Sequence, residues 1–158
     1  MKINYDVREA MEALQLKTLR KHQIQPINSI LDRRDTLVIA PTGSGKSAIF
    51  QVSALVMHRK CHPGTMFIEP TLSLMEDQVQ ALNAKGIRAN QISGNHPMDY
   101  NATKMTMDGP VYLQDLSAPF LYITPERLQS KPFQKAIRDN PPGLVVVDEQ
   151  HRFGCPPE

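Results

Sequence analysis

The chain has 158 residues, of which 41% are hydrophobic, so it can bury the core of one domain but not of two. Its 18 basic and 16 acidic residues give a net charge of +2, which neither requires nor excludes a nucleic-acid partner. No apolar run approaches the roughly 20 residues of a membrane helix and no signal-peptide pattern is present, so we expect an intracellular protein of the cytoplasm, nucleoid or nucleus. The two cysteines, Cys61 and Cys155, are far apart without a CxxC pattern, which argues against a disulfide framework.

Along the chain, apolar runs of strand length alternate with segments of helical period, which is typical of a parallel sheet with crossover helices. Helices are predicted at 7–14, 22–31, 46–58, 72–84 and 131–139, and strands at 36–40, 65–69, 88–92, 120–124 and 144–148. The stretch 93–118 has no sustained period and is expected to hold loops around a short helix. The predicted fold class is therefore α/β.

The sequence APTGSGKS, residues 40–47, has the spacing of a phosphate-binding P-loop and stands between a predicted strand and a predicted helix. Two glycines allow the backbone N–H groups to turn inward around phosphate oxygens. Lys46 supplies a cation for the β- and γ-phosphates, and the Ser47 hydroxyl suits Mg²⁺. An ordinary Gly-rich turn is the alternative, and the surrounding strand and helix argue against it. The predicted nucleotide loop consists of Thr42, Gly43, Ser44, Gly45, Lys46 and Ser47.

The sequence VVVDEQH, residues 145–151, places two acids at the end of a buried strand, where parallel α/β sheets bind ligands. With a P-loop upstream, Asp148 is predicted to hold Mg²⁺. Glu149 is predicted to orient and deprotonate the water that attacks the γ-phosphate. A solvated turn after the strand is the alternative for an isolated acid pair.

Five segments resemble, in order, motifs 0, I, Ia, Ib and II of superfamily 2 helicases, with most similarity to the RecQ-like branch. They are LRKHQIQPI at 19–27, APTGSGKS and FQVSAL within 40–55, EPTLSLMEDQVQAL at 69–82, YITPERL at 122–128 and VVVDEQH at 145–151. The resemblance spans nearly the whole chain. It implies a P-loop NTPase of RecA-like fold, with helices on both faces of a parallel sheet, from an ATP-dependent DNA helicase.

The resemblance also implies roles for single residues. Gln23 would read the adenine edge and Arg20 would stack on the base, so that ATP with Mg²⁺ is the expected cofactor. Single-stranded DNA would be held by Thr71, Ser73 and Thr124 through phosphate contacts, and Arg127 would do the same or pair with an acid. His151 would couple the γ-phosphate to a second lobe or to DNA. The implied catalytic residues are Lys46, Asp148, Glu149 and His151, and the implied metal ligands are Ser47 and Asp148.

Three features depart from the RecQ pattern. Leu16 stands where an aromatic residue is usual before motif 0, which weakens the expected adenine contact. Motif II reads DEQH followed by RFG, which looks like the RecG and Mfd type of DNA translocase. Only Phe153 stands where the family has an aromatic-rich loop after motif II.

Motif III, a second RecA-like lobe and the arginine fingers of motif VI do not fit in the few residues after motif II. We therefore expect 1–158 to be a partial first ATPase domain, with the second lobe supplied in cis or in trans, and to lack helicase activity alone. Its sheet should be incomplete, because the RecA-like order places the motif III strand between strands 36–40 and 144–148.

Other classes share part of this pattern. A small-molecule kinase would share the P-loop but has no reason to carry YITPERL, and NAKG at 83–86 lacks the guanine pattern of GTPases. The alternatives that stay open are a non-catalytic module that binds nucleotide or DNA, and a fragment of a RecG-like translocase.

Overall fold

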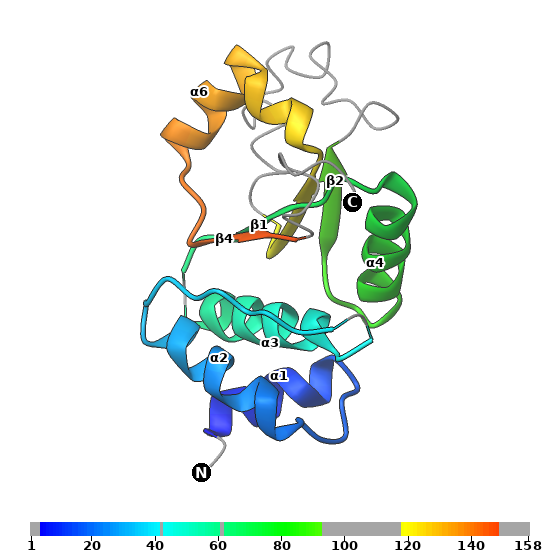
Figure 1. The fold of residues 1–158 in the computed structure, drawn as a ribbon. Helices are drawn as coiled ribbons and strands as arrows, with labels where there is room; N and C mark the ends of the chain where they lie inside the picture. The colour runs from blue at the N-terminus through cyan, green and yellow to red at the C-terminus, as the bar shows by residue number, and fades with distance from the viewer. Residues whose placement is uncertain (1–3, 42, 61, 93–117, 149–158) are drawn as a thin grey trace. The chain divides into compact units, whose positions relative to one another are not determined.

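The computed structural model describes residues 4–41, 43–60, 62–92 and 118–148. The chain forms two compact units, Met1–His62 and Pro63–Glu158, and each is described by itself (Figure 1). None of the described helices is long and apolar enough to cross a membrane.

The first unit is built from three helices and an extended segment that leads into the P-loop. Its helices are α1 (Tyr5–Ala13), α2 (Lys21–Leu31) and α3 (Lys46–Arg59). Buried residues lie on most sides of α3, and both α1 and α2 pack against it. The helix that follows the P-loop is therefore the centre of this unit.

The second unit is a four-stranded parallel sheet in the order β2-β3-β1-β4. Its strands are β1 (Thr65–Ile68), β2 (Ala89–Ile92), β3 (Phe120–Ile123) and β4 (Leu144–Val147). Helix α4 (Leu72–Ala84) follows β1, while the 3₁₀ helix η1 (Pro125–Gln129) and helix α6 (Lys131–Asp139) follow β3. The predicted α/β class with a parallel sheet is confirmed.

The two faces of this sheet differ in chemistry. One face is aliphatic and packs against Phe133 of α6, which is fully buried. On the other face the ring of Phe67 stacks on Phe120 at 5.5 Å and on Tyr122 at 4.6 Å between centroids. The aliphatic face consists of Met66, Ile68, Ile92, Leu121 and Ile123. Since neighbouring strands are in register, the aliphatic side chains of β1 and β3 share one face and their aromatic side chains share the other.

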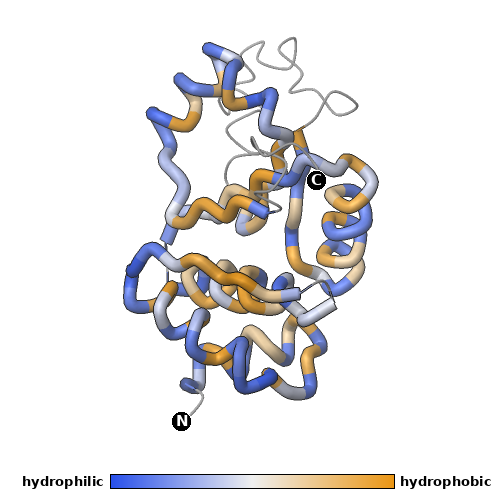
Figure 2. Tube along the Cα trace, in the orientation of Figure 1, coloured by the Kyte–Doolittle hydropathy of each residue, from blue (hydrophilic) through white to orange (hydrophobic). Residues whose placement is uncertain are grey.

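β4 pairs with β1 and with no other strand among the described residues, so it forms an edge of the sheet. Its side chains Val145 and Val147 are 47% and 38% exposed. Figure 2 shows β4 as a continuous apolar stretch. Among the described residues, β4 therefore presents an apolar edge.

The strand predicted at 36–40 is wrong. This segment belongs to no sheet of the described residues, and Leu37 and Ile39 are 73% and 90% exposed. β-branched residues favour an extended backbone, but a strand forms only where a neighbouring strand pairs with its N–H and C=O groups.

The other predicted elements are confirmed within two residues at each end, and α4 and α6 to the residue. Apart from Ala118, the stretch 93–118 lies outside the described residues.

Candidate functional site

The P-loop opens directly into α3. Gly43 and Gly45 have φ angles of +77° and +85°, which side-chain-bearing residues rarely adopt, so the backbone itself requires glycine at both positions. Within the described part of the chain, no atom accepts a hydrogen bond from the backbone N–H groups of Gly45, Lys46 or Ser47. These donors lie at the positive end of the α3 dipole, which is the arrangement that binds phosphate.

Three side chains from the start of α2 hold the P-loop. Gln23 is only 4% exposed, and its Nε2 donates to the carbonyl of Gly45 at 2.8 Å. The Arg20 guanidinium donates to the carbonyl of Ser44 at 3.2 Å, and His22 Nε2 lies 2.9 Å from the same oxygen. Because a carbonyl oxygen only accepts, the His22 proton must be on Nε2. The motif 0 segment and the P-loop thus form one hydrogen-bonded structure.

Gln23 uses one hydrogen bond at each end of its amide within the chain. Its Oε1 accepts the backbone N–H of Arg20 at 2.7 Å, while Nε2 bonds Gly45. An amide has two donors and two acceptor positions, so one of each has no partner among the described residues, which is what contact with an adenine edge would require. The contact with Gly45 is tight, since a Cβ there would lie 2.5 Å from Gln23 Nε2.

The residues of the loop fit a nucleotide phosphate group. Ser44 Oγ is buried and has no hydrogen-bond partner among the described residues. Lys46 is half-buried at the start of α3, and Ser47 next to it is exposed. The loop therefore combines backbone donors, a cation and two hydroxyls, which together suit a phosphate with a hard divalent cation.

In the second unit, three polar residues form one row at the carboxyl ends of β3, β1 and β4. They are Thr124, Glu69 and Asp148, each directly after the last paired residue of its strand. The Glu69 N–H donates to Ile123 O at 2.9 Å and the Asp148 N–H donates to Ile68 O at 3.2 Å, so the ladder continues through this row. Side chains in register on parallel strands point to the same face. The row therefore lies on the face that carries the stacked aromatic rings.

Glu69 is the central residue of the row and is 2% exposed. Its Oε1 accepts the backbone N–H of Thr71 at 3.0 Å. Thr71 is the N-cap residue of α4, but its own hydroxyl makes no capping bond. Glu69 thus fixes the backbone at the start of α4, and the Thr71 hydroxyl is not engaged by the helix.

A groove of about 460 Å³ lies where α4, η1 and α6 begin, and it is lined by Pro70, Leu72, Thr124, Glu126, Arg127 and Ser130. Two of the predicted nucleic-acid contacts, Thr124 and Arg127, are among its lining residues. The other two, Thr71 and Ser73, lie next to Leu72 in the chain, at the first turn of α4. The structure therefore gathers all four around the start of these helices.

Other predicted site residues are not brought together. Thr42, Glu149 and His151 lie outside the described residues. Lys46 and Ser47 belong to the first unit and Asp148 to the second, so their joint action on one Mg²⁺ stays a prediction. Among the residues that the structure describes, no three His, Cys, Asp or Glu side chains form a metal-binding group.

Two residues of these sites escaped the sequence analysis. His22 stands inside the motif 0 segment, so its position was visible but its contact with Ser44 was not. Glu69 opens the segment that resembles motif Ia, and its importance depends on the register between β1 and β4. Strand register is a tertiary property that a single sequence does not show.

The sequence profile of the DEAD/DEAH box helicases matches residues 20–155. The chain belongs to this family. It is similar to the ATP-dependent helicase SGS1 of Saccharomyces cerevisiae, 35% identical over 147 residues, and to the probable ATP-dependent DNA helicase RecS of Bacillus subtilis, 33% identical over 135 residues. It is also similar to the ATP-dependent DNA helicase RecQ of Haemophilus influenzae, 32% identical over 138 residues. These relatives confirm the RecQ-like resemblance.

The alignments cover 89%, 85% and 85% of this chain but 10%, 25% and 20% of the three relatives. The chain thus spans a tenth to a quarter of their length.

Solved structures agree with the fold. The helicase MrfA bound to DNA and AMPPNP matches with a TM-score of 0.65 at 17% identity, covering 96% of this chain and 21% of that one. A hypothetical ATP-dependent RNA helicase from Sulfolobus tokodaii matches with a TM-score of 0.61 at 18% identity, covering 96% of this chain and 44% of that one. At these identities the likeness concerns the fold alone.

Proposed function

We propose that this chain is the ATP-binding lobe of an ATP-dependent DNA helicase of the RecQ type. One observation carries the proposal: the buried Gln23 amide bonds the P-loop carbonyl of Gly45 at 2.8 Å, with Arg20 and His22 on the next carbonyl. An ordinary Gly-rich turn has no need of three polar side chains that fix its carbonyls. The bonds go to the carbonyls of the loop, and the N–H groups of residues 45–47 have no acceptor among the described residues, which suits an anion at the N-terminus of α3.

In this proposal the nucleotide phosphates lie against the backbone N–H groups at the start of α3, and Lys46 contacts the β- and γ-phosphates. Ser47 and Asp148 would hold Mg²⁺, which when bound neutralises charge on the phosphate oxygens. Gln23 and Arg20 would contact the base. Glu149 would act on the attacking water and His151 would respond to the γ-phosphate, in the roles that the family resemblance implies.

Single-stranded DNA would lie in the groove of the second unit. Thr124 and Arg127 line this groove, and the first turn of α4 offers the Thr71 hydroxyl and the exposed Ser73. Hydroxyls, a guanidinium and a helix N-terminus are the groups that contact phosphates without reading bases. The proposed DNA site is therefore indifferent to sequence.

Replacing Lys46 with Ala tests the nucleotide site. The variant should bind ATP with Mg²⁺ about tenfold to a hundredfold more weakly in calorimetry, because a charge-assisted contact contributes about 1.5 to 3 kcal/mol. The matched control is Lys17→Ala, since Lys17 is exposed and belongs to no predicted site. Equal ATP affinity of the wild type and Lys46→Ala would show that the P-loop is not the nucleotide site.

A further inference from the structure

Helix α6 has one apolar side and one basic side. Phe133 and Ala136 are 0% and 2% exposed and face the core. Lys131, Lys135 and Arg138 are all exposed and follow each other at intervals of four and three residues, which places them on one stripe of the helix. We call these three residues the basic stripe.

The cations of the basic stripe are not neutralised within the described residues. None of the ion pairs found there involves Lys131, Lys135 or Arg138. Surface lysines and arginines are commonly interspersed with acids, whereas an uncompensated row of cations raises the local potential toward a polyanion. The stripe therefore has the electrostatics of a phosphate-binding surface.

Hydrogen bonds fix the stripe relative to the proposed DNA groove. The Arg127 N–H donates to Thr124 O at 3.1 Å, the Ser130 N–H donates to Arg127 O at 3.0 Å, and the Gln134 N–H donates to Ser130 O at 2.9 Å. Ser130 lines the groove and is also the N-cap residue of α6. The stripe thus begins at the residue after the groove wall and runs for about 10 Å along the helix, from the rise of 1.5 Å per residue.

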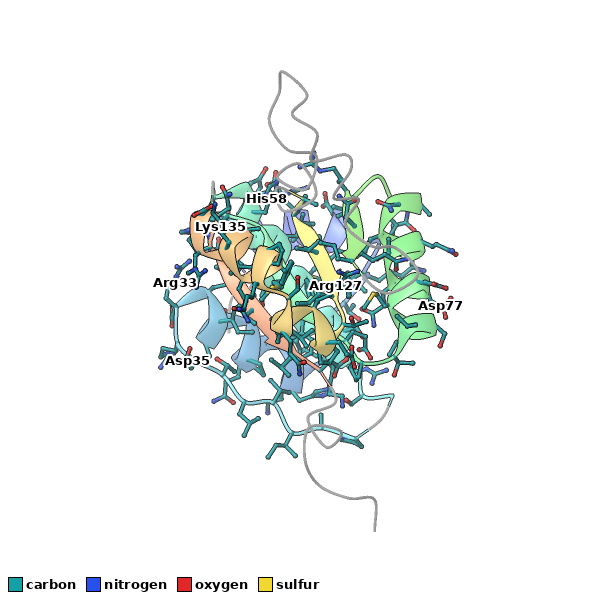
Figure 3. All side chains as sticks on the ribbon, turned by 90° about the horizontal axis from the view of Figure 1, so that it is seen from above. Arg33, Asp35, His58, Asp77, Arg127 and Lys135 are labelled. Atoms are coloured by element: carbon teal, nitrogen blue, oxygen red, sulfur yellow. The ribbon has the colours of Figure 1, made fainter. Side chains whose placement is uncertain are left out.

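The charged side chains beside the groove differ between the two directions in which a DNA strand could leave it, along α6 or along α4. Figure 3 shows Lys135 on α6 and Asp77 on α4 on opposite sides of Arg127. Asp77 is exposed. A polyanion that passes Arg127 therefore meets three cations and one exposed carboxylate, Asp139, along α6, whereas α4 presents the exposed carboxylate of Asp77.

We infer that the basic stripe is a second segment of the DNA site, where the phosphates of single-stranded DNA that continue beyond the groove contact Lys131, Lys135 and Arg138. The inference rests on the proposed function and extends the proposed DNA site from the groove to the basic stripe. The contacts go to phosphates, so they add affinity and salt dependence but no sequence preference.

The test compares the wild type with the triple variant Lys131→Gln, Lys135→Gln, Arg138→Gln in titrations of a fluorescent oligothymidine of about 12 nucleotides. Each phosphate contact contributes about 0.7 to the slope of log affinity against log salt on single strands, so the slope should fall by about 2. With an oligonucleotide of about 4 nucleotides, at the lower end of the site sizes of single-strand-binding folds, the two proteins should bind equally. Because the three residues are exposed, the far-ultraviolet spectrum and the melting temperature should not change.

The matched control is the triple variant Arg8→Gln, Lys17→Gln, Lys85→Gln, which makes the same change in net charge at residues outside α6 and outside every predicted site. It should keep the wild-type slope with the longer oligonucleotide. A stripe variant with the wild-type slope, or a control variant with an equal loss, would overturn the inference and leave the proposed function standing. A wild type that binds neither oligonucleotide would overturn both.

Discussion

Gln23 combines two roles, the proposed contact with the base and the support of the P-loop, which the sequence alone would assign to different residues. Its Oε1 accepts the backbone N–H of Arg20 and its Nε2 donates to the carbonyl of Gly45, so it supports the P-loop from a buried position. Any loss of nucleotide binding on mutation of Gln23 can therefore come from the base or from the loop. An experiment on this residue must separate the two.

If Gln23 reads adenine, Gln23→Ala should narrow the affinity gap between ATP and GTP by about 1 to 3 kcal/mol, the contribution of one good bidentate contact. Calorimetry with both nucleotides measures this gap. Inorganic tripolyphosphate, which has no base, serves as the control ligand, and any loss of its affinity in the variant measures the support that Gln23 gives the P-loop through Gly45. An unchanged ATP to GTP ratio combined with weaker tripolyphosphate binding would identify Gln23 as a support of the P-loop only.

Glu69 is a second residue that positions other groups, because its carboxylate fixes the backbone at the start of α4. Glu69→Ala removes the acceptor of the part-buried Thr71 N–H, whereas Glu69→Gln keeps an oxygen in its place. We expect the Ala variant to lose about 1 to 3 kcal/mol of stability and to bind single-stranded DNA more weakly, because the start of α4 loses its support. The Gln variant should retain DNA affinity. Thermal unfolding and fluorescence anisotropy measure the two effects, and wild-type DNA binding by Glu69→Ala would contradict the role.

At the scale of elements, the sequence predicts best what is decided locally. The limits of α4 and α6 follow from their apolar period and from flanking residues that end it. The segment 36–40 has the same local signal as a strand, yet it stays unpaired among the described residues, because pairing depends on a distant part of the chain. No short segment of the sequence predicts the strand order β2-β3-β1-β4 either.

The candidate sites divide in the same way. The P-loop and its left-handed glycines were predictable, since a local spacing pattern describes them. The row formed by Thr124, Glu69 and Asp148 was not, because three strands far apart in the sequence must first come into register. Local patterns thus identify binding loops, and tertiary register identifies the residues that support them.

At the scale of the whole molecule, these 158 residues correspond to a tenth to a quarter of the curated relatives. A polypeptide of residues 1–158 should bind ATP but hydrolyse it at least about 10³-fold more slowly than a full-length relative, because a trans-acting arginine contributes about 10³ to 10⁵ in rate in related NTPases. A phosphate-release assay with and without single-stranded DNA, beside full-length RecS, measures the difference. Rapid DNA-stimulated turnover by the 158-residue polypeptide would contradict this expectation.

The central place of β1 also has a consequence for the timing of folding. Of the described strands, β1 leaves the ribosome first, but the residues that pair with it follow about 55 positions later in β3 and about 80 positions later in β4. At about 5 to 20 residues per second, the nascent β1 waits roughly 4 to 16 s for its last partner. For that interval Met66, Phe67 and Ile68, all buried in the finished sheet, are open to water and to other nascent chains. Of the described strands, β1 is thus exposed to aggregation for the longest time during synthesis.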